Sequence, residues 1–327
     1  MPDLNELPEV NEANSDAPVK DAKSGNWVDR FAPAPTRPYL RLSRADRPVG
    51  TWLLYLPCLW GLGLAMLGTG SASFMDLWIA VGCGIGAFLM RGAGCTWNDI
   101  TDRNFDGRVE RTKSRPIPSG QVSVRGAAIW MAVQMGVAGL ILLTFPLPAI
   151  ILGLISLGPV AIYPFAKRFT WWPQVFLGIA FNWGALVAYT AHRDAIDWAV
   201  ILLYLAGIMW TLFYDTVYAH QDKEDDALIG IKSTARLFGD KTIVALRYFL
   251  MGVVVLMGAA VVLAMTPNAH ALAIVVALGG PWAMGWHLAW QMRHFDGDDT
   301  DVCLRLFRSN RDAGLIPVLF FAASLLL

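Results

Sequence analysis

Long apolar segments recur along the chain, each about as long as a helix that crosses a membrane. The hydrocarbon core of a bilayer is about 30 Å thick, so a helical span needs roughly 20 apolar residues. Segments near this length lie at residues 49–68, 75–97, 125–144, 148–166, 174–190, 198–219, 242–265, 268–290 and 312–327. They are not the alternating segments of about ten residues that build transmembrane barrels. The pattern predicts an all-α integral membrane protein with nine transmembrane helices.

The composition excludes an ordinary soluble domain. Of the 327 residues, 55% are hydrophobic and only 16% are charged, and the mean hydropathy is +0.46. A soluble domain typically has about 25% charged residues. The first forty residues differ, because they are polar, Pro-rich and without helical periodicity, which is typical of disorder. We therefore expect a disordered cytosolic tail, residues 1–40, and a transmembrane domain, residues 41–327.

Basic residues are sorted to one side of the predicted membrane. Of the 26 Lys and Arg residues, all but Arg193 lie in the N-terminal segment or beside the connections that follow even-numbered spans. Because cytoplasmic loops carry an excess of Lys and Arg, these parts are predicted to be cytoplasmic. The start, MPDLNELPEVNEANSD, holds five acids and no base, whereas transit peptides are Arg-rich and acid-poor and secretory signals begin with a positive segment. This favours a bacterial inner membrane.

An acidic cluster follows the second apolar segment. The stretch NDITDRNFD, residues 98–106, begins where that segment ends. If the helix continues, Asn98, Asp102 and Asp106 are four residues apart, so each step rotates by about 40° and the three form one stripe. Like charges repel at this spacing, which calls for a counter-cation. Asp99 is a weaker candidate for the same site.

A second acidic cluster, YDTVYAHQDKEDD at residues 214–226, leaves the sixth segment on the same side. Asp215, Asp222 and Asp226 are spaced by seven and four residues, which predicts one helical face. Oxygen ligands without a His or Cys pattern indicate a hard cation, Mg²⁺ or Ca²⁺, and Mg²⁺ usually keeps positions for substrate phosphates. Acidic loop residues are often merely solvated, but the recurrence after two even-numbered segments favours a cation site.

Basic residues follow both acidic clusters, and this pattern predicts that the site binds a diphosphate. Arg111, Lys113 and Arg115 follow the first cluster, and Lys232 follows the second. Metal ions and cationic side chains together neutralise diphosphate oxygens. The sequence contains no glycine-rich nucleotide phosphate loop, which argues against ATP. A diphosphate at the edge of an apolar bundle would belong to a lipid, and we expect no nucleic acid partner.

Residues near other span ends are also candidates. Arg47, Lys167 and Arg168 are candidates for a substrate carboxylate or diphosphate, and alternatively they anchor the spans on the basic side. Asp215 lies near membrane depth, where a charge costs about 2.5 to 3.5 kcal/mol on insertion scales. Asp215 and the neighbouring Tyr218 are therefore predicted to be functional.

Several stretches together resemble the UbiA superfamily of intramembrane aromatic prenyltransferases. The resemblance is carried by NDxxDxxxD after the second segment, DxxxD after the sixth, and RTKSRP after the first acidic cluster. Three longer stretches are similar to the 4-hydroxybenzoate polyprenyltransferase branch of ubiquinone biosynthesis: RLSRADRPVGTWLLYLPCLWG at 41–61, YPFAKRFTWWPQVFLG at 163–178, and YDTVYAHQDKEDDALIGIKSTARLFG at 214–239. The resemblance covers residues 41–327.

The resemblance implies a bundle of nine transmembrane helices around a central cavity, capped by the two acidic cytosolic loops. It also implies a polyprenyl diphosphate bound through Mg²⁺, with its isoprenoid tail in an apolar tunnel open to the lipid bilayer. The metal ligands implied are Asn98, Asp102, Asp106, Asp222 and Asp226. The implied reaction transfers the prenyl group to the ring carbon ortho to the hydroxyl of 4-hydroxybenzoate.

Two alternatives remain open at this point. A sister branch would use a naphthoate, homogentisate, chlorophyllide or haem acceptor with the same aspartate motifs, and only the flanking stretches favour 4-hydroxybenzoate. A cation-coupled transporter would instead place its acids near the bilayer midplane between broken helices. Here the acids cluster at one membrane face with Arg and Lys behind them, which favours the enzyme.

Overall fold

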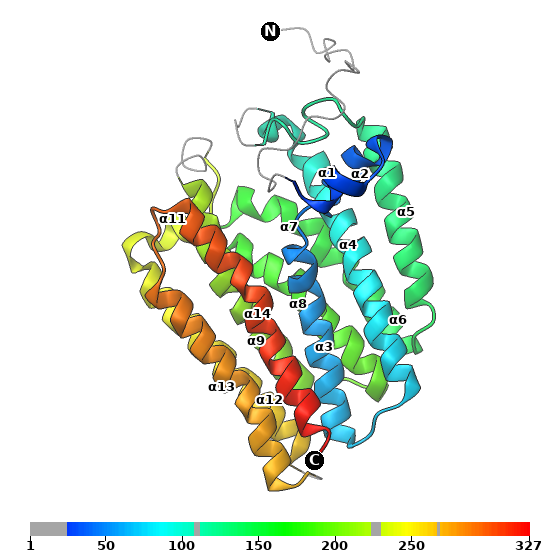
Figure 1. Ribbon diagram of the computed structural model, residues 1–327, viewed down its shortest axis with the longest axis vertical. Coiled ribbons are helices and arrows are strands. Elements are labelled where there is room, and N and C mark those ends of the chain that lie inside the picture. The colour runs from blue at the N-terminus through cyan, green and yellow to red at the C-terminus, as the bar shows by residue number, and fades with distance from the viewer. Residues whose placement is uncertain (1–24, 108–111, 224–229, 267–268) are drawn as a thin grey trace. The chain divides into compact units, whose positions relative to one another are not determined.

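The computed structural model describes residues 25–107, 112–223, 230–266 and 269–327, and all regular elements in these ranges are helical (Figure 1). The candidate residues Arg111 and Asp226 lie outside the described residues. The chain divides into two compact units, which are described separately. The first comprises Met1–Gly50 and Phe88–Leu140, and the second comprises Thr51–Ala87 and Ile141–Leu327.

The first unit begins with short helices in a segment predicted to be disordered. These are α1 (Trp27–Phe31), η2 (Ala34–Thr36) and α2 (Arg37–Leu42). The Asn26 side chain caps α1 by accepting from the backbone N–H groups of Val28 and Asp29, as N-cap residues do. The Trp27 indole donates to the Ala45 carbonyl at 2.7 Å, and Val28 is fully buried. These anchors extend the ordered part of the chain well into the predicted tail.

The rest of the first unit consists of the second half of α4 (Phe74–Asp106) and most of α5 (Val124–Leu142). Leu42 at the end of α2 is buried with Val122 and Ala127. Ser43 accepts a hydrogen bond from the Trp130 indole at 2.7 Å. These contacts hold the end of α2 against α5, so the turn that follows α2 has a defined position.

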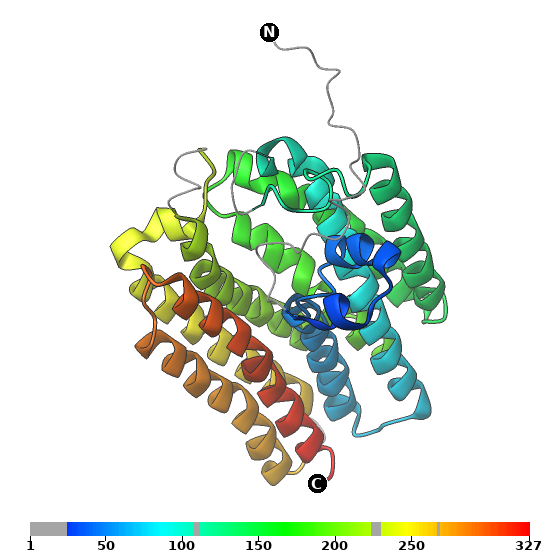
Figure 2. The same ribbon diagram turned by 45° about the horizontal axis from the view of Figure 1, so that its top comes forward.

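The second unit contains most of α3 (Val49–Thr69), the first half of α4, and the remaining helices. These are α6 (Leu147–Ile155), α7 (Leu157–Phe169), α8 (Pro173–Arg193), α9 (Trp198–Ala219), η3 (His220–Asp222), α11 (Thr234–Phe238), η4 (Gly239–Lys241), α12 (Thr242–Met265), α13 (Ala271–Arg293) and α14 (Thr300–Ser324). Helix α13 packs against both α12 and α14, and the three are drawn from yellow-orange to red (Figures 1 and 2). The indole of Trp210 donates to Asn310 Oδ1 at 2.9 Å, which fixes α9 against α14.

Eight helical stretches of the described residues are long and apolar enough to cross a membrane, with α6 and α7 counted together as Leu147–Phe169. They correspond to the first eight predicted segments, and this part of the prediction is confirmed. The ninth segment lies in α14, whose first half carries the charged residues Arg305, Arg308 and Arg311. The count of nine spans is therefore not confirmed, because those charges lower the hydropathy of the only long helix left.

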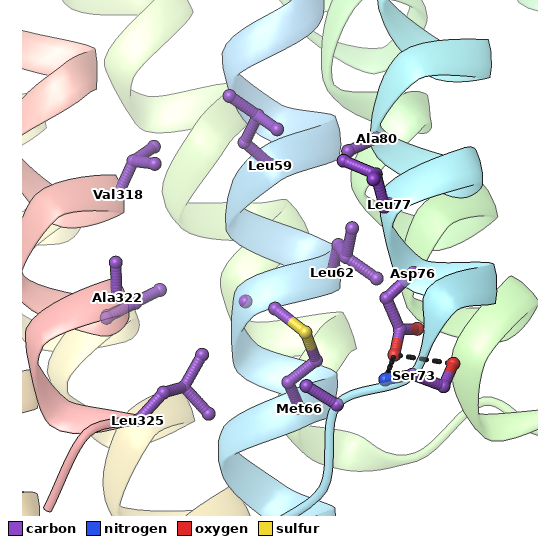
Figure 3. A pocket seen from close by; sticks show the side chains of 13 residues that line it. Leu59, Leu62, Met66, Ser73, Asp76, Leu77, Ala80, Val318, Ala322 and Leu325 are labelled. Carbon is purple, nitrogen blue, oxygen red and sulfur yellow. Dashed lines mark hydrogen bonds between the residues drawn. The ribbon is translucent and has the colours of Figure 1, made fainter.

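An apolar cavity of about 290 Å³ lies within the second unit, between α3, the start of α4 and the end of α14 (Figure 3). Asp76 is the one charged residue in its lining. Its carboxylate accepts from the backbone N–H of Ser73 at 2.6 Å and approaches His192 Nδ1 at 2.6 Å. These contacts give hydrogen-bond partners to a buried carboxylate at the edge of an otherwise apolar space.

Candidate functional site

Helix α4 continues past the end of the second predicted span and carries the first acidic cluster. At 1.5 Å per residue, its 33 residues measure about 50 Å, longer than a hydrocarbon core of about 30 Å. The predicted stripe of Asn98, Asp102 and Asp106 required the helix to continue beyond the span, and α4 does continue to Asp106. At about 100° per residue, Asn98, Asp99, Asp102 and Asp106 all fall within an arc of about 100° on α4.

The three aspartates of this arc are buried although α4 ends in a polar segment. The exposed fractions are 0% for Asp99, 1% for Asp102 and 8% for Asp106, whereas Asn98 is half-buried. Asp99, the weakest candidate from the sequence, is thus the most deeply buried of the three. A buried carboxylate is stable only when it is paired with cations or hydrogen-bond donors.

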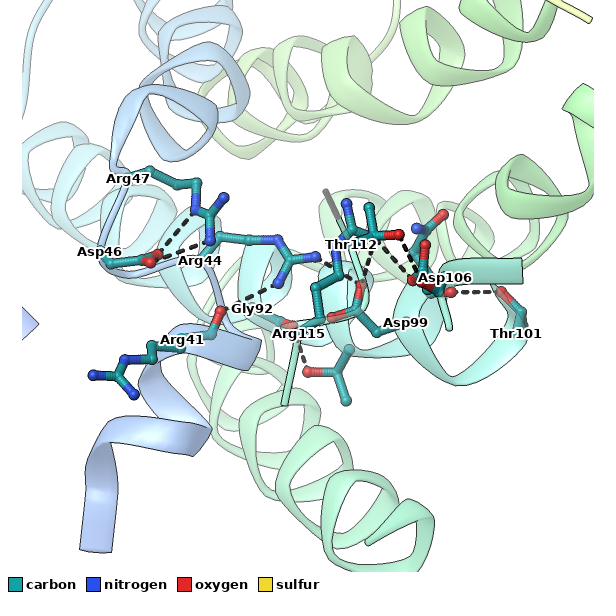
Figure 4. Close-up of polar contacts among 12 residues, drawn as sticks. Arg41, Arg44, Asp46, Arg47, Gly92, Asp99, Thr101, Asp106, Thr112 and Arg115 are labelled. Carbon is teal, nitrogen blue, oxygen red and sulfur yellow. Dashed lines mark hydrogen bonds and ion pairs between the residues drawn. The ribbon is translucent and has the colours of Figure 1, made fainter. Parts of the chain in front are cut away.

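Two arginines from different parts of the first unit pair with Asp99 and Asp106 of this arc (Figure 4). Arg44 Nη2 donates to Asp99 Oδ1 at 2.7 Å. Arg115 Nη1 lies 2.8 Å from Asp106 Oδ2 and 3.4 Å from Asp99 Oδ1. Arg115 was predicted to contact diphosphate, and in the structure it bridges two carboxylates.

A tight turn that begins at Thr112 positions Arg115. Thr112 Oγ1 donates to the Asp106 carbonyl at 2.8 Å, which ties the turn to the last residue of α4. The Arg115 N–H donates to the Thr112 carbonyl at 2.9 Å, and Ser119 Oγ donates to the Arg115 carbonyl at 2.7 Å. The turn from Thr112 onward therefore directs the Arg115 guanidinium back toward α4.

The second acidic cluster, in the second unit, has a different surrounding. The α-helix ends at Ala219, and Asp222 lies in the 3₁₀ turn η3, so the predicted single α-helical face does not extend to Asp222. Asp215 and Asp222 are half-buried. The Tyr218 ring lies 4.4 Å from the Phe307 ring of α14.

His220 fixes the geometry of η3. Its Nδ1 lies 2.9 Å from the Thr216 carbonyl, and its Nε2 lies 3.3 Å from Thr242 Oγ1 at the start of α12. The ring packs edge-on against Phe295 at 5.0 Å. His220 is 6% exposed. Neutral hydrogen bonds and ring packing therefore hold the turn that carries Asp222.

Basic residues from two segments meet near the end of α7. The Lys232 N–H donates to the Lys167 carbonyl at 3.3 Å, and Lys232 Nζ donates to the Phe169 carbonyl at 3.4 Å. Both Lys232 and Arg236 face the Trp171 ring, at 5.9 and 5.4 Å from its centroid. The structure thus brings the backbone of Lys232 beside that of Lys167. Arg236 joins them without having been predicted as a site residue.

The remaining candidates, Arg47, Arg168 and Lys113, have other surroundings. Arg47 pairs with its neighbour Asp46 at 3.1 Å. The Arg168 guanidinium lies over the Phe165 ring at 5.0 Å. Lys113 is exposed. Arg44 was missed, and its position in RLSRADRP, within the stretch that resembles the family, was the only signal for it.

The oxygen donors of the first cluster fit a hard divalent cation. Asn98, Asp102 and Asp106 supply an amide oxygen and carboxylates, without His or Cys. Asp99 Oδ2 is buried and lacks a hydrogen-bond partner in the described part of the chain. Among the described residues, no group of three or more His, Cys, Asp or Glu side chains forms a complete metal site. A site shared by both acidic motifs therefore stays a prediction.

Comparison with known proteins identifies the family. Residues 54–312 match the family model described as the UbiA prenyltransferase family. The chain belongs to this family. The family predicted from the aspartate motifs is thus confirmed.

Named relatives agree with the predicted branch. The chain is 47% identical over 290 residues to the mouse (Mus musculus) protein named 4-hydroxybenzoate polyprenyltransferase, mitochondrial, covering 88% of this chain and 75% of that protein. The human (Homo sapiens) protein of the same name is 45% identical over 289 residues, with the same coverage of each chain.

The fold of the UbiA family is seen in a solved relative. A UbiA homolog from Archaeoglobus fulgidus, solved with GPP and Mg²⁺, has a TM-score of 0.65 and 20% identity, covering 89% of this chain and 100% of that chain. At this identity the similarity establishes the fold. It confirms the predicted all-α membrane fold of the family.

The prediction of a bacterial inner membrane is wrong by these comparisons, since the named relatives are mitochondrial proteins of mouse and human. The prediction rested on the acidic composition of the first 16 residues. The sorting of Lys and Arg distinguishes the two faces of a membrane. It does not distinguish one membrane from another, so charge alone was insufficient for this assignment.

Proposed function

We propose that the chain transfers a polyprenyl group from a polyprenyl diphosphate to the ring carbon ortho to the hydroxyl of 4-hydroxybenzoate, with Mg²⁺ as cofactor. The observation that carries the reaction class is the arc of buried aspartates at the end of α4, two of which pair with Arg44 and Arg115. The names of the mouse and human relatives support 4-hydroxybenzoate as the acceptor.

Asn98, Asp102 and Asp106 would hold Mg²⁺ together with Asp222, and with Asp226 outside the described residues. When bound, Mg²⁺ neutralises charge on the diphosphate and thereby favours departure of this group. The Archaeoglobus homolog was solved with a prenyl diphosphate, GPP, and Mg²⁺, which supports this choice of cation.

The basic residues would bind the departing diphosphate. Arg115, Lys113 and Lys232 supply N–H donors for its oxygens, and Lys167 lies beside Lys232 in the second unit. The C–O bond to the diphosphate breaks and its electron pair leaves with the diphosphate. The ring carbon then forms the new C–C bond to the allylic carbon, and loss of the ring proton restores aromaticity. A water-excluding membrane site protects the allylic cation.

The apolar cavity between α3, α4 and α14 is proposed to hold part of the isoprenoid tail. Its lining is almost wholly apolar, as in Leu59, Leu62, Val318 and Ala322 (Figure 3). Such a lining favours hydrocarbon over water. Ala322→Trp would fill this space, and we expect it to shift the preferred donor toward shorter prenyl diphosphates in a chain-length series.

The proposal is tested with the full chain in detergent, labelled 4-hydroxybenzoate and a polyprenyl diphosphate. We expect prenylated product with Mg²⁺ and none with EDTA. Asp102→Asn and Asp222→Asn should each lower kcat at least 100-fold, because each removes a proposed ligand charge. Asp240→Asn, a change of the same kind at an exposed residue of η4, is the matched control and should stay near wild type.

The acceptor is tested separately. Product with a naphthoate or homogentisate acceptor but none with 4-hydroxybenzoate would contradict the proposed acceptor and keep the reaction class. No product with any acceptor, from folded protein, would contradict the reaction class itself.

A further inference from the structure

Arg44 occupies a conformation that favours glycine. Its φ is +56°, in the left-handed region, which residues with a Cβ rarely adopt. The turn that imposes this conformation is closed by hydrogen bonds from the Arg44 N–H to the Arg41 carbonyl at 3.0 Å and from the Ala45 N–H to the Leu40 carbonyl at 3.0 Å. Strained residues persist where the surrounding structure determines them, often at functional sites.

The Arg44 side chain is as constrained as its backbone. It is 9% exposed, donates to Asp99 Oδ1 at 2.7 Å, and also donates to the Arg41 carbonyl at 3.3 Å. Asp99 is fully buried. A long basic side chain is therefore buried, on a strained turn, against a carboxylate that lies on the same helical arc as the proposed metal ligands.

Asp99 differs from Asp106 in how it is paired. Asp99 Oδ1 faces both guanidinium groups, Arg44 at 2.7 Å and Arg115 at 3.4 Å. Asp106 Oδ2 faces Arg115 at 2.8 Å. Arg115 thus stands between an aspartate already neutralised by Arg44 and an aspartate proposed to bind Mg²⁺. These four side chains comprise two acids and two bases, and the buried Asp102 lies on the same arc.

We propose that Asp99 and Arg44 are positioning residues that act through Arg115. Arg44 partly neutralises Asp99, so Asp99 attracts Arg115 only weakly and keeps it beside α4. In the free enzyme Arg115 neutralises Asp106. When a divalent cation takes Asp106, Arg115 keeps its contact with Asp99 and turns its other N–H groups to the diphosphate. This inference rests on the proposed function, because it takes Asp106 as a cation ligand and diphosphate as the anion.

The test measures cation binding without substrate. Full-length protein in detergent is titrated with Mn²⁺, an oxygen-binding probe, and free Mn²⁺ is measured by electron paramagnetic resonance. Asp99→Asn should weaken Mn²⁺ binding about fivefold, because Asp99 no longer draws Arg115 away from Asp106. Arg44→Gln should tighten it about threefold, because an unneutralised Asp99 draws Arg115 more strongly. A purely structural role would not move the two variants in opposite directions.

A double variant separates positioning from net charge and protects the test against misfolding. Arg44→Gln with Asp99→Asn keeps the wild-type net charge and leaves neither buried charge without its partner. We expect Mn²⁺ binding to stay weakened, since Arg115 has lost Asp99. A return to the wild-type Kd would overturn the proposal, because net charge alone would then explain the single variants. Arg41→Gln, in the same segment, removes a buried arginine that pairs with Asp29 at 2.8 Å and should leave Mn²⁺ binding within about twofold.

Kinetics complete the test. Both single variants should raise KM for the prenyl diphosphate about tenfold, with a smaller change in kcat, because Arg115 is misplaced for the diphosphate. Unchanged KM, or Mn²⁺ shifts in the same direction, in protein whose wild type is active would overturn the positioning role. Opposite Mn²⁺ shifts in the single variants, with binding still weakened in the double variant, in a protein that transfers no prenyl group would support the positioning role and contradict the proposed function.

Discussion

The two acidic clusters are held in place by different physical means. In the first unit, Asp99 and Asp106 are buried and face Arg44 and Arg115 at 2.7 to 3.4 Å. In the second unit, the turn with Asp222 is held by neutral groups, through His220, Thr216 and Thr242. Ion pairs depend on each partner's charge, whereas neutral hydrogen bonds and packing spread the stabilisation over more contacts.

This difference indicates where each cluster is sensitive. Removing one member of a buried ion pair leaves an uncompensated charge, which is strongly destabilising. Asp222 is half-buried, so its loss should affect chemistry more than folding. Substitutions in the first cluster are thus expected to lower both stability and activity. Substitutions at Asp222 in the second cluster are expected to lower activity with little loss of stability.

The largest expected effect is on stability. Asp99→Ala leaves the buried Arg44 without its 2.7 Å partner and should lower the free energy of unfolding by about 3 to 5 kcal/mol. Asp222→Ala should lower it by about 1 kcal/mol or less, because the side chain is half-buried. Thermal unfolding in detergent at one fixed scan rate compares the two. Equal losses of stability would contradict the distinction between the clusters.

The next largest effect is on donor binding. Arg115→Gln should raise KM for the prenyl diphosphate about thirtyfold, because a charge-assisted contact is lost at a nearly buried site. Lys232→Gln should raise it only about fivefold, since Lys232 Nζ bonds the Phe169 carbonyl and faces Trp171. Steady-state kinetics with varied prenyl diphosphate decide this. A larger increase in KM for Lys232→Gln than for Arg115→Gln would contradict the greater role assigned to Arg115 in donor binding.

A moderate effect is expected from the neutral contacts. His220→Ala removes contacts to the Thr216 carbonyl and Thr242 Oγ1 and should lower kcat about tenfold by loosening the turn that carries Asp222. Thr242→Val removes only the second contact and should lower kcat about threefold. If Thr242→Val were as damaging as His220→Ala, the Thr242 contact alone would control the turn.

The smallest effect is expected at Trp171. Its ring faces Lys232 and Arg236 at 5.9 and 5.4 Å. Trp171→Leu keeps an apolar side chain but removes the ring face, so KM for the prenyl diphosphate should rise about threefold. Trp171→Phe is the matched control and should recover much of the affinity. A loss of kcat with unchanged KM would instead indicate a role outside donor binding.

The sequence by itself determined the membrane-spanning helices and the first acidic arc. Hydropathy is a local property, so eight spans could be located from the apolar segments. Helical spacing is also local, which is why Asn98, Asp102 and Asp106 were correctly expected on one side of α4. The motifs were sufficient for the family, because they combine residue type, order and spacing.

Only the tertiary structure decided which arginines form ion pairs with Asp99 and Asp106. Asp99 meets Arg44 from 55 residues earlier in the chain and Arg115 from 16 residues later, and no local pattern encodes those contacts. Likewise, the end of α9 changes to a 3₁₀ turn where His220 bonds the Thr216 carbonyl and Thr242 of α12. Burial and charge pairing arise from segments distant in sequence, so the roles of Arg44, Asp99 and His220 became visible only once the chain was folded.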